Sequence, residues 1–382
     1  MKITVPTSRT RSLWIVVPAL LAIAALAAYG LWPRPDPAAV WNRAEDALNS
    51  ERIDEAEALS RQLTRLRPPL DRDWLLRGQV AIARKRNDEA IADLMRVPDS
   101  SPLAPQARLM AGQIELRRNR VRHAETFLRA AVRLDPKLVQ AHRELTFLYG
   151  MQSRRGPLAE QFRILSELEP LTFQHVYLWC LTRGTVWEPN EIVEFMSRYL
   201  KADPDDVWSR LALANALQHL GRLDEAWQAL EPLPDSNPDA RAARARLAID
   251  RGDMAVAEAL LAEGPEDHAE LARLRGKLAL RRRDAAAALR HFRASDAAEP
   301  ANRDTIFGIA QALRMAGRND EAAPYVKLAR EHDLITSLMQ YAATNEGKKD
   351  PALPMKLGAA HEAIGRFQEA RAWYQLRIDA DP

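Results

Sequence analysis

The feature that most constrains this chain is a proline that returns every 34 residues. Six prolines stand in this register without a gap: Pro68, Pro102, Pro136, Pro170, Pro204 and Pro238. A fixed period of this length is typical of repeat proteins, in which each unit is one supersecondary element and neighbouring units bury each other's apolar faces. Because proline cannot continue a helix interior, each of these prolines predicts the end of a helix between units.

Two columns of small residues recur inside each unit. The first column holds Ala44, Gly78, Gly112, Thr146, Cys180, Ala214, Ala245, Gly276, Ala310 and Gly358. The second holds Ala56, Ala90, Ala124, Leu158, Ile192, Ala226, Ala257, Ala288, Ala322 and Ala370. Small side chains let two antiparallel helices cross closely, so the columns predict one helix pair in each unit. We therefore expect alanine at Gly276 to cost little and leucine there to cost about 1–3 kcal/mol by overpacking. Glycines between the columns suit the left-handed end of a first helix.

This pattern resembles the tetratricopeptide repeat family. The resemblance implies an all-α superhelical solenoid of about ten helix-turn-helix repeats. The expected repeats lie near residues 37–70, 71–104, 105–138, 139–172, 173–206, 207–237, 238–268, 269–302, 303–336 and 351–382. Residues 337–350 are an insertion, expected to form a short helix and an exposed loop. We expect irregular curvature in units four and five, where Leu158 and Ile192 replace alanine, and in units seven and nine, which lack the closing proline.

The N-terminal segment predicts a membrane anchor. Residues 13–32 carry no charge, and twenty helical residues span about 30 Å, the thickness of a bilayer core. Residues 1–12 form a short basic tail, which the positive-inside rule places in the cytoplasm, and residues 33–36 form a proline-rich linker. The bacterial layout that we expect is a single-pass protein of the cytoplasmic (inner) membrane whose solenoid faces the periplasm or exterior. A cleaved signal peptide, cut near Ala27, is the alternative interpretation.

Charge and cysteine content exclude several classes of function. The formal net charge is +3, but residues 37–382 carry equal numbers of basic and acidic side chains. A neutral body argues against bulk binding of nucleic acid. Cys180 is the one cysteine of the sequence, so an internal disulfide and a four-cysteine zinc site are excluded.

The sequence carries no nucleotide-binding or hydrolase signature. His361 and Glu362 begin a zinc-protease motif, but Gly365 stands where its second histidine belongs. We therefore expect no catalytic, cofactor-binding or metal-binding residues and a protein that is not an enzyme.

The concave face that successive first helices form is where such solenoids bind partners. Transferring the family's groove positions onto this chain gives eight candidate partner-binding residues: Tyr177, Trp208, Asn215, Arg246, Arg273, Lys277, Arg281 and Arg314. The acidic residues Asp239, Asp250, Glu270 and Asp304 lie among them. This set is either an ordinary mixed surface or a groove for an extended or helical peptide of acidic character. In the second case, reversing Arg273 and Lys277 to glutamate should abolish binding and leave melting unchanged.

The function that follows is a non-enzymatic, membrane-anchored scaffold that binds a partner protein or peptide in its groove, as in envelope-complex assembly. Two alternatives stay open. The chain reaches Pro382 without the extra polar helix that usually covers the last repeat, which fits the N-terminal module of a larger enzyme. Signal-peptide cleavage would instead give a secreted periplasmic scaffold.

Overall fold

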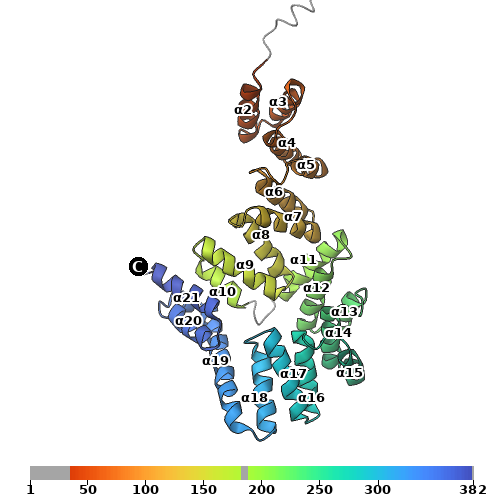
Figure 1. Ribbon diagram of the computed structural model, residues 1–382, viewed down its shortest axis with the longest axis vertical. Coiled ribbons are helices and arrows are strands. Elements are labelled where there is room, and N and C mark those ends of the chain that lie inside the picture. The colour runs from red at the N-terminus through yellow and green to blue at the C-terminus, as the bar shows by residue number, and fades with distance from the viewer. Residues whose placement is uncertain (1–34, 182–187, 381–382) are drawn as a thin grey trace, which may run out of the picture. The chain divides into compact units, whose positions relative to one another are not determined.

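The computed structural model describes residues 35–181 and 188–380, and the regular structure in these two ranges is entirely helical (Figure 1). The predicted basic tail and the membrane helix at 13–32 lie outside the described residues. Within the described ranges, none of the helices has both the length and the apolar character that crossing a bilayer requires.

Twenty α-helices in the described ranges follow one another as ten pairs, which confirms the predicted all-α solenoid. The pairs are α2 (Pro37–Asn49) with α3 (Ile53–Leu66), α4 (Asp71–Ala83) with α5 (Asn87–Leu94), α6 (Ala104–Arg117) with α7 (Val121–Leu134), α8 (Val139–Met151) with α9 (Arg155–Leu168), α10 (Phe173–Leu181) with α11 (Pro189–Ala202), α12 (Val207–His219) with α13 (Leu223–Leu230), α14 (Pro238–Arg251) with α15 (Met254–Ala262), α16 (Ala269–Arg281) with α17 (Ala285–Ala298), α18 (Arg303–Met315) with α19 (Asn319–Ala343), and α20 (Leu353–Ala363) with α21 (Phe367–Ala380).

The two columns of small residues lie where the helices of a pair cross. The alanines of the second column are at most 3 % exposed, from Ala56 to Ala370. In the first column, a Cβ added to Gly78 would come within 2.7 Å of Leu94, and one added to Gly112 within 2.8 Å of Leu128. The close backbone approach that the columns predict is therefore present.

One crossing is tighter than the sequence indicates. The ring of Phe292 on α17 is fully buried and lies against Gly276 of α16 and Gly308 of α18. A Cβ on Gly276 would stand 2.9 Å from this ring, and one on Gly308 2.4 Å. The expectation that alanine at Gly276 costs little is wrong, because the aromatic ring already fills the space of the missing methyl group.

The turns between paired helices share one left-handed residue. Gly221, Gly252, Gly317 and Gly365 have positive φ, as predicted for glycine at a helix end. Five units place another residue at the equivalent position with φ between 54° and 60°: Glu51, Lys85, Asn119, Ser153 and Arg283. The turn conformation is thus set by the helix pair, and glycine only relieves its cost.

The insertion at 337–350 differs from the expected short separate helix. Helix α19 continues through residue 343 and is 25 residues long, and a 3-10 helix follows at Gly347–Lys349. No glycine or proline occurs between residues 325 and 343 to end the helix, so the second helix of unit nine runs on into the insertion. The loop begins at Thr344.

The chain divides into two compact lobes, which we call the N-terminal lobe (residues up to 97) and the C-terminal lobe (residues from 98). In the N-terminal lobe the core is formed by residues of α2, α3 and α4, including Leu63 and Leu76. In the C-terminal lobe the largest buried cluster extends from Leu109 to Trp373 and so joins repeats that are far apart in the sequence.

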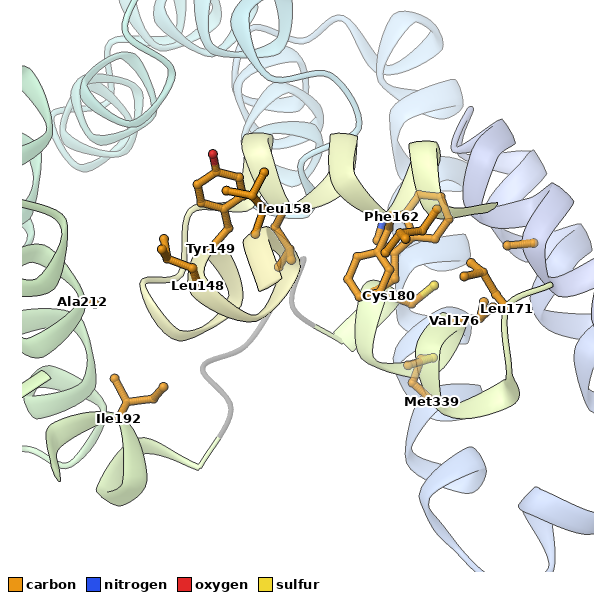
Figure 2. Packing of buried hydrophobic residues seen from close by; sticks show 14 of the residues in the cluster. Leu148, Tyr149, Leu158, Phe162, Leu171, Val176, Cys180, Ile192, Ala212 and Met339 are labelled. Atoms are coloured by element: carbon orange, nitrogen blue, oxygen red, sulfur yellow. The ribbon is translucent and has the colours of Figure 1, made fainter. Parts of the chain in front are cut away.

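Within the C-terminal lobe the fifth repeat is split. Helix α10 packs against α21, α19 and α9, whereas α11 packs against α12. The rings of Phe173 on α10 and Trp373 meet edge to face with their centroids 5.5 Å apart. The indole Nε1 of Trp373 donates a hydrogen bond to Cys180 Sγ at 3.3 Å. Figure 2 shows Val176 and Cys180 beside Met339 of α19, with Ile192 apart from them near Ala212. The last repeats therefore close against the middle of the C-terminal lobe (Figure 1), at a unit where irregularity was expected.

Candidate functional site

A cavity of about 1290 Å³ lies inside the C-terminal lobe. Its walls come from the first helices α10, α12, α14, α16 and α18, as the groove of a repeat solenoid requires. Because the last repeats close against α10, helix α19 and the turn before α21 also contribute, through His332, Met339 and Arg366.

The structure brings six of the eight predicted partner-binding residues together on this wall. They are Tyr177, Asn215, Arg246, Arg273, Lys277 and Arg281. The residues that follow the first small column, Asn215, Arg246, Lys277 and Gln311, lie at one equivalent position of four successive first helices.

Trp208 does not line the cavity. Its ring lies under the guanidinium of Arg154, whose Cζ is 4.7 Å from the ring centroid. Arg154 also lies 4.5 Å from the ring of Tyr149 and donates to Glu125 at 2.6 Å and 3.0 Å. Trp208, predicted to face the groove, thus contacts the turn between α8 and α9, and its part in partner binding stays a prediction.

Arg314 does not line the cavity either. Its helix α18 contributes Arg303, Asp304 and Gln311, and Asn302 before it. Arg314 lies in the last turn of that helix with an exposed side chain. The cavity ends before this turn, and the part predicted for Arg314 in partner binding stays a prediction.

The cavity wall is positively charged. Among the described residues that line it, seven carry a cationic side chain and three carry a carboxylate. The cations are Arg155, Arg246, Arg273, Lys277, Arg281, Arg303 and Arg366, and the carboxylates are Asp250, Glu270 and Asp304. A concave site lined by one sign of charge concentrates the field and attracts ligands of the opposite sign.

Arg246 is held by a polar network that fixes its guanidinium. Nε donates to Gln218 Oε1 at 2.8 Å, Nη2 donates to Asn215 Oδ1 at 3.2 Å, and Nη1 lies 3.5 Å from Glu270. Burial lowers the pKa of Arg246, and the charge of Asp250 acts against this. Partial removal from water strengthens the electrostatic attraction that such a charge exerts on a ligand.

Arg273 is the most buried of the predicted cations, with 8 % of its surface exposed. It forms ion pairs with Glu270 and, at 3.4 Å, with Glu299. Burial lowers its pKa, and the charges of Glu299 and Asp304 oppose that effect. Reversing Arg273 to glutamate would place a buried carboxylate against the partly exposed carboxylates of Glu270 and Glu299, so we expect this change to lower the melting temperature.

Lys277 and Arg281 are the accessible cations of α16. Lys277 Nζ donates to Asp304 Oδ2 at 2.7 Å, and both side chains are about half exposed. Burial acts to raise the pKa of Asp304, but the hydrogen bond and charge of Lys277, with Arg273 and Arg303, lower it overall. Arg281 is exposed, and its Nη1 lies 3.1 Å from Met254 Sδ.

Apolar side chains also line the cavity. Tyr177 of α10 stacks on Phe173 with ring centroids 6.2 Å apart, and Ile335 and Met339 of α19 line the same cavity. The site thus combines fixed cations with aromatic and aliphatic side chains, an arrangement suited to non-covalent binding of an amphipathic ligand. Within the described residues, no group of acidic, histidine or cysteine side chains is placed to hold a metal ion.

Sequence reasoning missed Arg155, Arg303, His332 and Arg366. Groove positions of the family lie on first helices, whereas Arg155, His332 and Arg366 lie on second helices or in a turn, and Arg303 is the first residue of the first helix α18. His332 and Arg366 reach the cavity because the last repeats close against α10, and the repeat columns contain no signal for that closure.

Comparison with known proteins supports the tetratricopeptide repeat assignment. Models described as "Tetratricopeptide repeat" match residues 42–98, 75–138 and 188–247. No curated protein sequence matches the chain. A tetratricopeptide repeat protein from Parabacteroides merdae has 17 % identity and a TM-score of 0.34, with 64 % of this chain and 98 % of that one covered. The C-terminal part of a TPR repeat-containing protein from Cytophaga hutchinsonii has 13 % identity and a TM-score of 0.32, with 70 % of this chain and 99 % of that one covered. Human IFIT1, a dimer with PPP-AAAA, has 16 % identity and a TM-score of 0.35, with 89 % of this chain and 88 % of that one covered.

Proposed function

We propose that this protein is a non-enzymatic scaffold that binds a short acidic segment of a partner protein in the cavity of the C-terminal lobe. Tetratricopeptide repeats indicate protein-interaction scaffolds, and the charge of this cavity supports an acidic ligand. The observation that carries the proposal is the excess of cations over carboxylates among the residues that line this cavity.

The size and chemistry of the cavity support a peptide. Its volume of about 1290 Å³ exceeds the roughly 300–1,000 Å³ of small-molecule pockets. The lining carboxylates Asp250, Glu270 and Asp304 would repel the closely spaced phosphates of a nucleic acid, whereas a peptide can place its acidic residues between them. Tyr177 and Met339 offer contacts for apolar side chains of the same peptide.

The membrane anchor at 13–32 belongs to the proposal. An anchored scaffold would hold its partner at the outer face of the cytoplasmic membrane, as in envelope-complex assembly. A reporter active only outside the cytoplasm, fused after residue 382, should be active in membranes. An active cytoplasmic reporter with a silent external one would contradict this orientation, and activity in the soluble periplasmic fraction would favour the secreted alternative. A chain that continues past residue 382 into a catalytic domain is the other alternative.

Site-specific cross-linking in cells that make the full-length protein tests the binding site. A photoreactive amino acid is placed at Gln311, which lines the cavity, or at Arg314, which lies one turn further along α18 and does not. We expect a protein adduct at Gln311 and none above background at Arg314. The cross-linked peptide should be rich in Asp and Glu. Equal adducts at both positions, or an RNA adduct at Gln311, would contradict the proposal.

A further inference from the structure

One end of the cavity, between α18, α19 and the turn before α21, contains a buried histidine nitrogen that has no hydrogen-bond partner. His332 of α19 lines the cavity, is 5 % exposed, and its Nε2 has no hydrogen-bond partner. A buried polar atom without a partner is unfavourable in free energy, so it requires an explanation such as a ligand.

Cations surround this histidine on neighbouring elements. Arg366 of the turn before α21 and Arg303 of α18 both line the cavity, and both lower the pKa of His332. The Nη2 of Arg366 donates to the carbonyl of Ala301 at 2.9 Å, which holds its guanidinium near the start of α18. Arg303 forms an ion pair with Asp333 at 2.7 Å.

We propose that Arg303, Arg366 and His332 form a subsite for one carboxylate of the bound peptide. The inference rests on the proposed function and names the contact that this end of the cavity makes. Two arginines on different elements supply planar donors suited to a carboxylate, and His332 supplies the polar group beside them.

A singly charged carboxylate fits this subsite better than a phosphate. Asp333 is next to His332 in the sequence and its carboxylate already lies against Arg303. A second negative charge on the ligand would face this carboxylate at close range, where like charges repel. The carboxylate can come from a Glu or Asp side chain or from the C-terminus of the peptide.

Binding at the subsite has a predictable effect on His332. Burial lowers the pKa of His332 to about 4, with Arg366, Arg303 and His361 acting in the same direction and Asp333 against them. A carboxylate held by the two arginines offsets their field, so the pKa of His332 should rise. The affinity for a carboxylate should therefore increase from pH 7 to pH 5, at least about twofold.

The test follows the imidazole nitrogens of the full-length protein in detergent, with all eight histidines ¹⁵N-labelled. His332→Gln assigns the His332 signal; if that variant does not fold, Arg366→Lys assigns it by shifting the same signal. The probes are N-acetyl-glutamate N-methylamide, which has a side-chain carboxylate, and N-acetyl-alanine, which has a C-terminal one. N-acetyl-glutamine N-methylamide and inorganic phosphate serve as controls.

We expect at least one carboxylate probe to raise the pKa of His332 and to leave His142, which lies outside this cavity, unchanged. The stronger probe identifies the source of the carboxylate. Arg303→Gln and Arg366→Gln should each remove the response, and Arg366→Lys should retain some of it.

The outcome is independent of the cross-linking experiment. If the carboxylates leave His332 unchanged while Gln311 still cross-links to an acidic peptide, the subsite is wrong and the proposed function stands. If Gln311 gives no adduct but a carboxylate raises the pKa of His332, the subsite stands without the scaffold. A response to phosphate that exceeds the response to both carboxylates would overturn the assignment of the ligand class.

Discussion

At the scale of single residues, Phe292 shows how the small columns act. Its ring packs against Gly276 and Gly308 in the helices on either side, so one aromatic side chain joins two repeats through two missing methyl groups. Each glycine carries an intrinsic cost of about 1 kcal/mol in a helix relative to alanine, and close packing of the ring offsets that cost.

Alanine at Gly308 should therefore destabilise the protein, although it is the better helix former. Its Cβ would stand 2.4 Å from the Phe292 ring, and overpacking costs about 1–3 kcal/mol. Gly156 at the start of α9 is the matched control, because a Cβ there meets nothing within 4 Å. Chemical denaturation should show a lower free energy of unfolding for Gly308→Ala and an unchanged one for Gly156→Ala. Equal stability of the two variants would show that the ring does not fill this space.

The left-handed turn residues predict a stabilising substitution. Arg283 has φ 59°, which costs a residue with a Cβ about 1–2 kcal/mol, whereas its neighbour Arg282 is helical with φ −79°. Arg283→Gly should raise the free energy of unfolding by about 1 kcal/mol, and Arg282→Gly should lower it or leave it unchanged. Both variants remove one positive charge from the same exposed turn, and Arg282→Gly also removes an exposed ion pair with Glu258, which contributes little. An equal shift of the melting temperature in both variants would contradict the turn geometry.

The buried His332 also predicts a pH dependence of stability. Its pKa is lowered from 6.5 to about 4 in the fold, so the unfolded chain binds more protons between these values. The stability that neutral His332 provides is present above pH 6.5 and is lost as the pH falls from 6.5 towards 4. At pH 5 the free energy of unfolding should be about 2 kcal/mol lower than at pH 7. Urea denaturation at both pH values measures it. His332→Gln should reduce the difference between pH 7 and pH 5, and an undiminished difference would show that other groups cause it.

At the scale of helices, arginines stabilise the ends of shortened second helices. Helices α13 and α15 end after eight and nine residues, which leaves carbonyl groups beyond their ends. Arg244 donates to the carbonyls of Leu230 and Leu233, and Arg275 donates to those of Leu261, Glu263, Gly264 and Pro265. An arginine of the following first helix thus supplies the donors that a longer second helix would have provided.

Replacing Arg275 by methionine should expose this dependence. The change keeps much of the aliphatic stem of Arg275 but removes every hydrogen-bond donor of the side chain. The carbonyls left without partners should lower the free energy of unfolding by about 1–3 kcal/mol. Arg330→Met, at an exposed position of α19, is the control. Hydrogen exchange should increase in residues 254–265 for the first variant alone. Unchanged exchange there would show that water satisfies these carbonyls equally well.

Local elements could be predicted from the sequence because each repeat constrains its own two helices. The column glycines and alanines mark both helices of eight of the ten pairs, and the four turn glycines mark the end of the first helix in four of these. Two features depend on context beyond one repeat: the continuation of α19 to residue 343, and the departure of α10 from α11. A periodic pattern specifies which helices pair within a unit, but not which distant unit covers an exposed face.

At the scale of the molecule, closure of the last repeats against α10 converts an open groove into the cavity of the C-terminal lobe. The contact between Trp373 and Cys180 joins segments 193 residues apart. Groove positions on first helices, such as Asn215, Arg246 and Lys277, could be predicted from the repeat register. Trp208 could not, because the split of unit five redirects it, and His332 and Arg366 could not, because closure alone brings them to the site.

The most direct test of the account is the yield of the Gln311 cross-link when one charge of the cavity is reversed. Arg281 and Arg282 are adjacent and exposed, but Arg281 lines the cavity and Arg282 does not. If the cavity binds an acidic segment, Arg281→Glu should lower the adduct yield several-fold. Arg282→Glu, which reverses an exposed ion pair with Glu258 outside the cavity, should leave the yield unchanged. An equal yield in both variants would contradict binding of an acidic partner in this cavity.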